Sequence, residues 1–413
     1  MKTSITSSLS LKNVNLLILS LIVFSLPLNL KFISPLIALY VLSSIVFIGI
    51  KKPKFEVKLS NLFLITFYLL LIIGLMWSSN LRSAFFDLEV KLSLLIFPLI
   101  FSFIRYSKSE LIILLKLFCA GLVISSSLLL VLAYVSYNNS SDISDFFYIN
   151  LSPKIHPSYL SMYYVVGMSV ILVALRNNVF ETIFGRFAAV ILVVVFFVFN
   201  LLLLSKIGII VSTLILVYFV ARYVLINKKF GIGILVVIAL SSAFYYSFQN
   251  LPYFKQRVVE LSDGLNSTSK SNGSTAVRLK IWNTGMKLIA QSLIFGYGTG
   301  DVKDALMAEY AEDENYSAYA KKLNAHNQFI QVTVALGIVG FIVFLLALGF
   351  LLVEGLHGGN LYTVFFVIAS IFYMFPESVL ENQAGTIFFG LFFALLNQKS
   401  LHETANSNTI LSA

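Results

Sequence analysis

Four polar or charged side chains lie within or beside apolar segments, where such groups are costly. His326 and Asn327 begin the apolar segment "AHNQFIQVTVALGIVG", Lys206 separates two apolar runs at "LLLLSKIG", and Arg278 lies in "RLKIWNTG". A cation between membrane spans is unfavourable unless it faces a cavity or an anion. A lysine and an arginine can hold a phosphate group, and a neutral histidine can accept a proton. On one face of a membrane, these residues would form a site for displacing a phosphate leaving group.

Each of these residues also has a purely structural interpretation. Lys206 can extend its ammonium group to the membrane interface, and Arg278 can stack on Trp282. His326 can be a satisfied polar residue at a helix end, and His156 is predicted to lie at the same membrane boundary. Two further histidines are predicted on the cytoplasmic side of the membrane and are interpreted as solvent-exposed residues without a functional role: His357 and His402.

The composition indicates the kind of protein that must position these side chains. Of the 413 residues, 58% are hydrophobic and 12% are charged, and the mean hydropathy is +0.90. Apolar runs of about 20 residues recur along the chain, which is typical of a polytopic α-helical membrane protein. The net charge of +10 is concentrated in short loops on one side of the predicted membrane, so it does not indicate nucleic-acid binding. The single cysteine, Cys119, excludes an intramolecular disulfide.

The apolar runs predict an all-α fold with about twelve transmembrane helices. Residues 187–220 would make one helix of about 51 Å, which exceeds the hydrocarbon core of about 30 Å, so a tight turn is predicted at Ser205–Gly208. Lys and Arg in the short loops favour cytoplasmic termini. The predicted spans are 14–30, 32–50, 61–77, 89–105, 110–136, 157–175, 186–204, 207–224, 231–247, 327–352, 361–375 and 382–397.

One long polar segment divides the chain into three parts. Residues 1–248 hold predicted spans one to nine, residues 249–325 form a large loop on the periplasmic side, and residues 326–413 hold the last three spans and a cytoplasmic tail. Within the loop, residues 267–275 read as a flexible linker, and residues 276–291 have the periodicity of an amphipathic helix at the membrane surface. Residues 295–301 predict a turn, and one or two short helices follow it. No metal-ligand spacing or phosphate-binding loop is present.

Several motifs together resemble the O-antigen ligase family, whose superfamily also contains O-antigen polymerases. The pair His326-Asn327 is followed by Gly337 and Gly340 at the spacing of the family's histidine motif. Residues 278–301 resemble its arginine-tryptophan segment, and "LLLLSKIG" resembles its serine-arginine segment, with Lys206 in place of the arginine. Lysine keeps the charge and lacks the bidentate geometry. The segments "HPSYLSMYYVVG", from residue 156, and "PESVLENQAGTIFFG", from residue 376, are also similar to this family.

The resemblance implies a glycosyltransferase of the bacterial inner membrane that works at the periplasmic face without a bound metal or cofactor. Its donor would be a glycan on undecaprenyl diphosphate, and its acceptor a lipid A-core sugar hydroxyl. His326 would be the general base, with Arg278 and Lys206 holding the diphosphate. Substrate-binding roles are expected for five residues: Asn327, His156, Trp282, Glu377 and Glu381. Gly337 and Gly340 would let a neighbouring helix approach closely.

Three other functions stay open at this point. An O-antigen or exopolysaccharide polymerase would use the same donor with another glycan as acceptor, and one sequence does not separate it from a ligase. A non-enzymatic exporter of the lipid-linked glycan would also need outer cations, together with a central charged pathway. A scaffold for glycan assembly would leave Lys206 without a role.

Overall fold

The computed structural model describes residues 3–28, 31–265 and 274–398. All regular elements in these ranges are helices, so the predicted all-α class is confirmed. The α-helices are α1 (Thr3–Ser25), α2 (Ile33–Lys51), α3 (Leu59–Ile73), α4 (Leu81–Lys91), α5 (Ser93–Phe103), α6 (Lys108–Ser140), α7 (Tyr148–Leu151), α8 (Pro157–Arg176), α9 (Ile183–Leu202), α10 (Lys206–Asn227), α11 (Phe230–Asn250), α12 (Pro252–Leu265), α13 (Ser274–Gln291), α14 (Val302–Glu312), α15 (Tyr316–Ala320), α16 (Gln328–His357), α17 (Leu361–Met374) and α18 (Gln383–Leu396). Four 3₁₀ segments accompany them: η1 (Leu26–Leu28), η2 (Gly74–Trp77), η3 (Ile143–Phe146) and η4 (Val379–Glu381).

Nine helical segments in the described ranges are long and apolar enough to cross a membrane. They are α1 with η1, α2, α3 with η2, α6, α8, α9, α10, α11 and α16. The multi-pass character is therefore supported, while the count of twelve spans stays a prediction. The other three predicted spans, 89–105, 361–375 and 382–397, correspond to shorter helices. Helix α5 has 11 residues, and α17 and α18 have 14 each. A helix of 14 residues is about 21 Å long, shorter than a hydrocarbon core of about 30 Å.

Two sequence predictions about connections can be compared directly with the structure. The tight turn near Ser205 is confirmed: α9 ends at Leu202, α10 begins at Lys206, and the Ser205 side chain accepts a hydrogen bond from the Gly208 amide. The predicted span 89–105 differs from the structure, since α4 ends at Lys91 and α5 begins at Ser93. Lys91 and the acidic residues around it therefore lie on a short helix that is not among the candidate spans.

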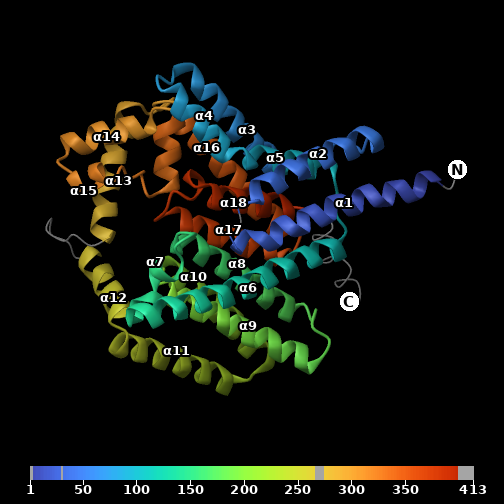
Figure 1. Cartoon of the computed structure of the whole chain (residues 1–413), viewed down its shortest axis with the longest axis vertical. Helices are drawn as coiled ribbons and strands as arrows, with labels where there is room; N and C mark the ends of the chain where they lie inside the picture. The colour runs from blue at the N-terminus through green and yellow to red at the C-terminus, as the bar shows by residue number, and fades with distance from the viewer. Residues whose placement is uncertain (1–2, 29–30, 266–273, 399–413) are drawn as a thin grey trace.

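The interior of the bundle is formed by α8, α17 and α18, and the longer helices pack around them (Figure 1). Every residue of α18 from Gly385 to Leu396 is buried, and α8 is buried from Tyr159 to Ala174. The inner faces are rich in aromatic rings, which bury large apolar areas. The loop that follows α17 therefore emerges from a tightly packed centre and has a defined position.

Helix α16 is broken at Gly337, whose φ of 63° is left-handed. The turn at residues 293–298 hydrogen-bonds into this break: the amides of Tyr297 and Gly298 donate to the carbonyls of Val334 and Ala335 at 2.8 and 2.9 Å. A Cβ atom at Gly337 would lie 2.1 Å from the Ile294 carbonyl oxygen. The close approach predicted for this glycine therefore exists, but a turn makes it and not a neighbouring helix. Gly340 faces Leu336 of its own helix.

The polar segment 249–325 contributes α12 to α15, which lie along one edge of the molecule (Figure 1). The predicted helix at 276–291 is confirmed as α13, and the predicted short helices are α14 and α15. The turn at 295–301 is also present. Most of the linker predicted at 267–275 lies outside the described residues, as do His402 and the C-terminal tail. Helix α13 packs on α16, and this contact brings Arg278 of α13 to the end of α16 that follows His326.

Candidate active site

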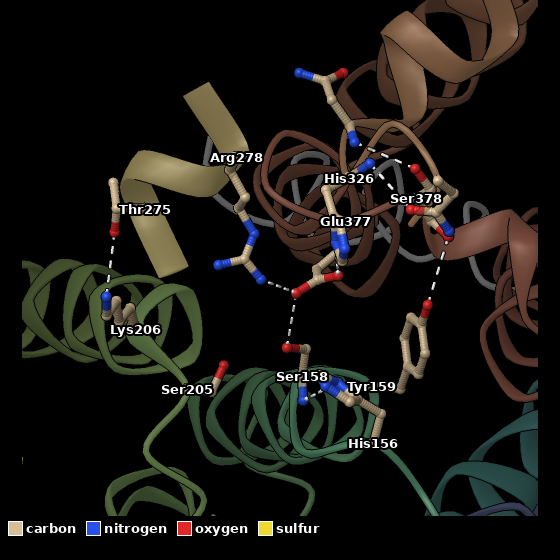
Figure 2. A network of polar contacts seen from close by, with 12 residues as sticks. His156, Ser158, Tyr159, Ser205, Lys206, Thr275, Arg278, His326, Glu377 and Ser378 are labelled. Atoms are coloured by element: carbon tan, nitrogen blue, oxygen red, sulfur yellow. Dashed lines mark hydrogen bonds and ion pairs between the residues drawn. The ribbon is translucent and has the colours of Figure 1, made fainter. Parts of the chain in front are cut away.

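The centre of the site is the carboxylate of Glu377, which lies in the loop between α17 and η4 and is only 5% exposed. Its Oε1 accepts hydrogen bonds from Nη2 of Arg278 at 2.6 Å and from Oγ of Ser158 at 3.1 Å. Its Oε2 lies 3.3 Å from Nδ1 of His326 (Figure 2). One buried carboxylate thus joins residues from α8, α13 and the N-terminal end of α16.

The charge state of Glu377 follows from these partners. Burial raises the pKa of this carboxyl, but the hydrogen bond from His326, the charge of Arg278 and the charge that His326 carries when its ring is protonated outweigh it and hold the pKa at about 2. Glu377 is therefore ionised across the physiological range. An ionised carboxylate only accepts hydrogen bonds, so the hydrogen of His326 belongs on Nδ1. The lone pair of its Nε2 is then left to accept a proton.

The backbone of His326 is held on several sides in an uncommon conformation. Its φ is 43°, in the left-handed region. Its amide donates to Oδ1 of Asn324 at 3.0 Å, and its carbonyl accepts from Nε1 of Trp282 at 3.1 Å. The next amide, that of Asn327, donates to Oγ of Ser378 at 3.2 Å. Such a strained residue persists only when its surroundings fix it, and here they fix the direction of the imidazole.

The side chains of Asn327 and Trp282 form hydrogen bonds within the protein. The side chain of Asn327 caps α16 by accepting from the amides of Phe329 and Ile330 at 2.9 and 3.1 Å. Asn327 is 6% exposed. Trp282 donates a hydrogen bond to the His326 carbonyl, and Arg278 forms an ion pair with Glu377. These contacts suggest that both residues position His326.

Lys206 and Arg278 approach the same turn of α13. The ammonium group of Lys206 lies 3.2 Å from Oγ1 of Thr275 and 3.4 Å from Oε2 of Glu260 on α12. Thr275 and Arg278 are three residues apart, which places them on one face of the helix. Figure 2 shows Lys206 and Arg278 on either side of this turn. A ligand with several negative oxygens could therefore meet both cations.

Most hydrogen-bond donors of Arg278 remain available. A guanidinium group has five N–H donors, and within the described residues only Nη2 has a hydrogen-bond partner. Its Nε is buried without any partner among these residues. Because unmet buried donors are costly, the guanidinium group is suited to bind an anion beside Glu377.

The other two predicted site residues are placed differently. Nδ1 of His156 caps α8 by accepting from the Ser158 amide at 3.3 Å, and Ser158 in turn contacts Glu377. Glu381 lies outside this network and binds the ammonium group of Lys91 at 2.7 Å. His156 therefore borders the site, and Glu381 belongs to a second polar cluster. Among the described residues, no three His, Cys, Asp or Glu side chains are grouped to hold a metal ion.

Comparison with known proteins is consistent with the motifs at these positions. Residues 191–345 match the family described as O-Antigen ligase. The matched segment, which is less than half of the chain, is thus similar to the O-antigen ligase family. It is also similar to an uncharacterized protein of Haemophilus influenzae, with 24% identity over 176 residues. That match covers 40% of this chain and 44% of the relative, so the chain spans less than half of the relative's length.

The segment that matches the O-antigen ligase family contains Lys206, Arg278 and His326. Glu377 lies beyond it, although it is the residue that joins Arg278 to His326. Two contacts of the site have no counterpart in the sequence reasoning, namely those of Ser158 and Ser378. Both follow predicted residues closely, in "HPS" and "PES", and this proximity is the only sequence feature that could have indicated them.

Proposed function

We propose that this protein belongs to the O-antigen ligase superfamily and is a glycosyltransferase that moves a glycan from undecaprenyl diphosphate to a sugar hydroxyl of the lipid A-core. The observation that carries the proposal is the pair of Glu377 and His326, in which an ionised carboxylate orients an imidazole through Nδ1. This arrangement is that of a general base with its orienting acid. The superfamily supplies the class of donor and acceptor.

The reaction follows from the positions of the groups. Nε2 of His326 takes the proton of the acceptor hydroxyl while that oxygen attacks the anomeric carbon of the donor sugar. The bond between the anomeric carbon and the diphosphate oxygen breaks, and undecaprenyl diphosphate leaves with the electron pair. Glu377 stabilises the imidazolium ion that forms. His326 then releases its proton to solvent and returns to its starting state.

The two cations act on the leaving group. The free N–H donors of Arg278 bind the diphosphate, and its Nη2 stays on Glu377. Lys206 exchanges its contact with Glu260 for a phosphate oxygen. Donors that are already in place when charge develops are often the largest contribution to catalysis. The reaction needs no metal or cofactor in this scheme.

The same proposal sets the location of the site. His326, Arg278 and Lys206 face the periplasm, residues 249–325 are the large periplasmic loop, and both termini are cytoplasmic. The excess of Lys and Arg in the short cytoplasmic loops supports this orientation. The enzyme then receives its donor from the outer leaflet of the inner membrane, and the polyprenyl chain rests in a groove between helices.

A lipopolysaccharide gel of a deletion strain tests the proposal. Without a ligase, no O-antigen is attached to the core, and the wild-type gene restores it while the His326→Ala gene does not. A single repeat unit on the core would identify a polymerase. Loss of surface glycan with lipid-linked donor retained inside would identify an exporter, and an unchanged gel would contradict all three functions.

A further inference from the structure

Three hollows meet around α4, and the ring of Phe86, which is 67% exposed, lines all of them. The inner hollow has a volume of about 260 Å³ and is lined by Asp87, Lys91, Glu381, Asn324 and Gln331, among others. A second, of about 480 Å³, includes Arg82, Lys303, Asp304 and Lys322. A third, of about 410 Å³, includes Lys154, His156, Glu381 and Asn382. Shared lining residues join them into a single surface, called here the α4 groove.

The inner part of the α4 groove carries hydrogen-bond acceptors. Lys91 is only 3% exposed and lies between two carboxylates, with Glu381 at 2.7 Å and Asp87 within hydrogen-bond distance. Two carboxylates around one ammonium group leave an excess of acceptor oxygens. Burial and the charge of Glu381 raise the pKa of Asp87 to about 7 against the opposing effect of Lys91. These groups suit a ligand rich in hydroxyls.

The outer part of the α4 groove is basic. Arg82, Lys303 and Lys322 are exposed, and none of them forms an ion pair within the part of the chain that the structure describes. Asp304 is the acidic residue that lines this hollow, and its Oδ2 accepts from Nδ2 of Asn80 at 2.8 Å. Three cations against one carboxylate suit an anionic substituent.

The walls of the α4 groove are fixed to each other. The amides of Ser79 and Asn80, just before α4, both donate to the carboxylate of Asp301 at 2.7 Å, and Asp301 immediately precedes α14. A Cβ atom at Gly300 would lie 2.2 Å from the Asn80 carbonyl oxygen. Helix α4, which carries Asp87, and helix α14, which carries Lys303, are therefore held in one arrangement before any ligand binds.

The α4 groove leads toward the site but does not include His326. Its third hollow reaches His156, which bonds the Ser158 amide, and the Ser158 hydroxyl bonds Glu377. An exposed aromatic ring offers an apolar face to a sugar ring, and carboxylates and amines bond its hydroxyls. A chain of sugars could thus extend from the site across Phe86 to the basic rim.

We propose that the α4 groove binds a saccharide chain with acidic substituents. Its hydroxyls contact Asp87 and Glu381, one sugar ring packs on Phe86, and a carboxylate or phosphate group contacts Lys303 and Lys322. The inference rests on the proposed function only in taking this saccharide as part of a substrate, and it names that substrate as an acidic glycan. Carboxylated and phosphorylated sugars share the chemistry that the rim recognises.

Binding to the purified full-length protein in phosphatidylcholine nanodiscs tests the α4 groove without any transfer. The probes are tetragalacturonate, a glucose tetrasaccharide that carries one phosphate, and neutral maltotetraose. We expect both acidic probes to bind more tightly than maltotetraose. Lys303→Ala with Lys322→Ala should weaken binding of the acidic probes by about tenfold, because the variant removes two exposed cations that would pair with the acidic group. The matched control, Lys228→Ala with Lys229→Ala, removes equal charge from the exposed connection between α10 and α11.

The outcomes separate this inference from the proposed function. Preference for one acidic probe identifies the acidic group. Equal binding of acidic and neutral probes, or equal effects of the two double variants, would overturn the α4 groove as an acidic-glycan site. A Phe86→Ala variant that binds as wild type would do so too, since Phe86 would then be only an interfacial aromatic residue. If the acidic probes bind as expected but the His326→Ala gene restores O-antigen in the gel, the proposed function alone would be overturned.

Discussion

Replacing Glu377 by glutamine removes the negative charge beside His326 while keeping the size of the side chain. The amide oxygen can still accept hydrogen bonds from Arg278 and Ser158, which lie 2.6 and 3.1 Å from Oε1. The imidazole loses the carboxylate that selects its Nδ1–H tautomer and stabilises its protonated form. Glu377→Gln should therefore fold normally and transfer glycan slowly.

The size of the effect follows from the pKa of Glu377. A fall from the ordinary 4.5 to about 2 corresponds to about 3 kcal/mol at about 1.4 kcal/mol per pH unit. This free energy is a net value, because the contributions of His326, Arg278 and His156 must first outweigh the burial of the carboxylate. The part that acts on His326 should lower kcat by about 10- to 100-fold. KM for the acceptor should not change, since Glu377 is proposed to position the base.

The assay is transfer of labelled glycan from the polyprenyl donor by purified protein, with the acceptor concentration varied. Glu354→Gln is the matched control, because Glu354 accepts hydrogen bonds from Ser60 in a different part of the molecule. Normal kcat with a raised KM would refute the reasoning and make Glu377 an acceptor-binding residue.

Three further predictions test other parts of the account. Lys206→Arg should keep substantial transfer and Lys206→Met should lose most of it; normal turnover of the Met variant would make this residue a snorkelling lysine. Gly337→Ala should lower the free energy of unfolding by about 1–3 kcal/mol or more, because its Cβ would meet the Ile294 carbonyl at 2.1 Å, and Gly349→Ala, in open space, should be silent in thermal unfolding. For Asp87, whose pKa is raised from 3.8 to about 7, stability is lost as the pH rises from the lower to the higher value, so Asp87→Asn should gain stability relative to wild type between these pH values and no more above about 7 in denaturation experiments. A gain that does not depend on pH would contradict this last prediction.

The sequence predicted the helices well where length and hydropathy decide the structure. The turn at Ser205 follows from a run too long for one span, and α13 follows from its own periodicity. The break at Gly337 was not predictable in the same way, because apolar residues continue through it. It depends on hydrogen bonds from Tyr297 and Gly298 in a distant turn.

The site was predictable in its residue types and only partly in its contacts. His326, Arg278 and Lys206 stand out because charged and polar groups are rare near apolar runs. The role of Glu377 depends on partners 51 and 99 residues away, and no local pattern encodes that distance. Glu381, only four residues later, bonds Lys91 instead, so proximity in sequence alone would assign both acids to one site.

Transfer activity of His326→Ala tests the central claim most directly. A general base accelerates a reaction by about 10²–10⁴-fold, so purified His326→Ala should retain at most about 1% of the wild-type transfer rate. The variant should insert into the membrane and elute from a size-exclusion column in detergent as the wild type does. His357→Ala, at the other end of α16, should transfer as wild type, and EDTA should change neither rate. Near-normal transfer by His326→Ala would contradict the account, because the Glu377 and His326 pair would then have no part in the chemistry.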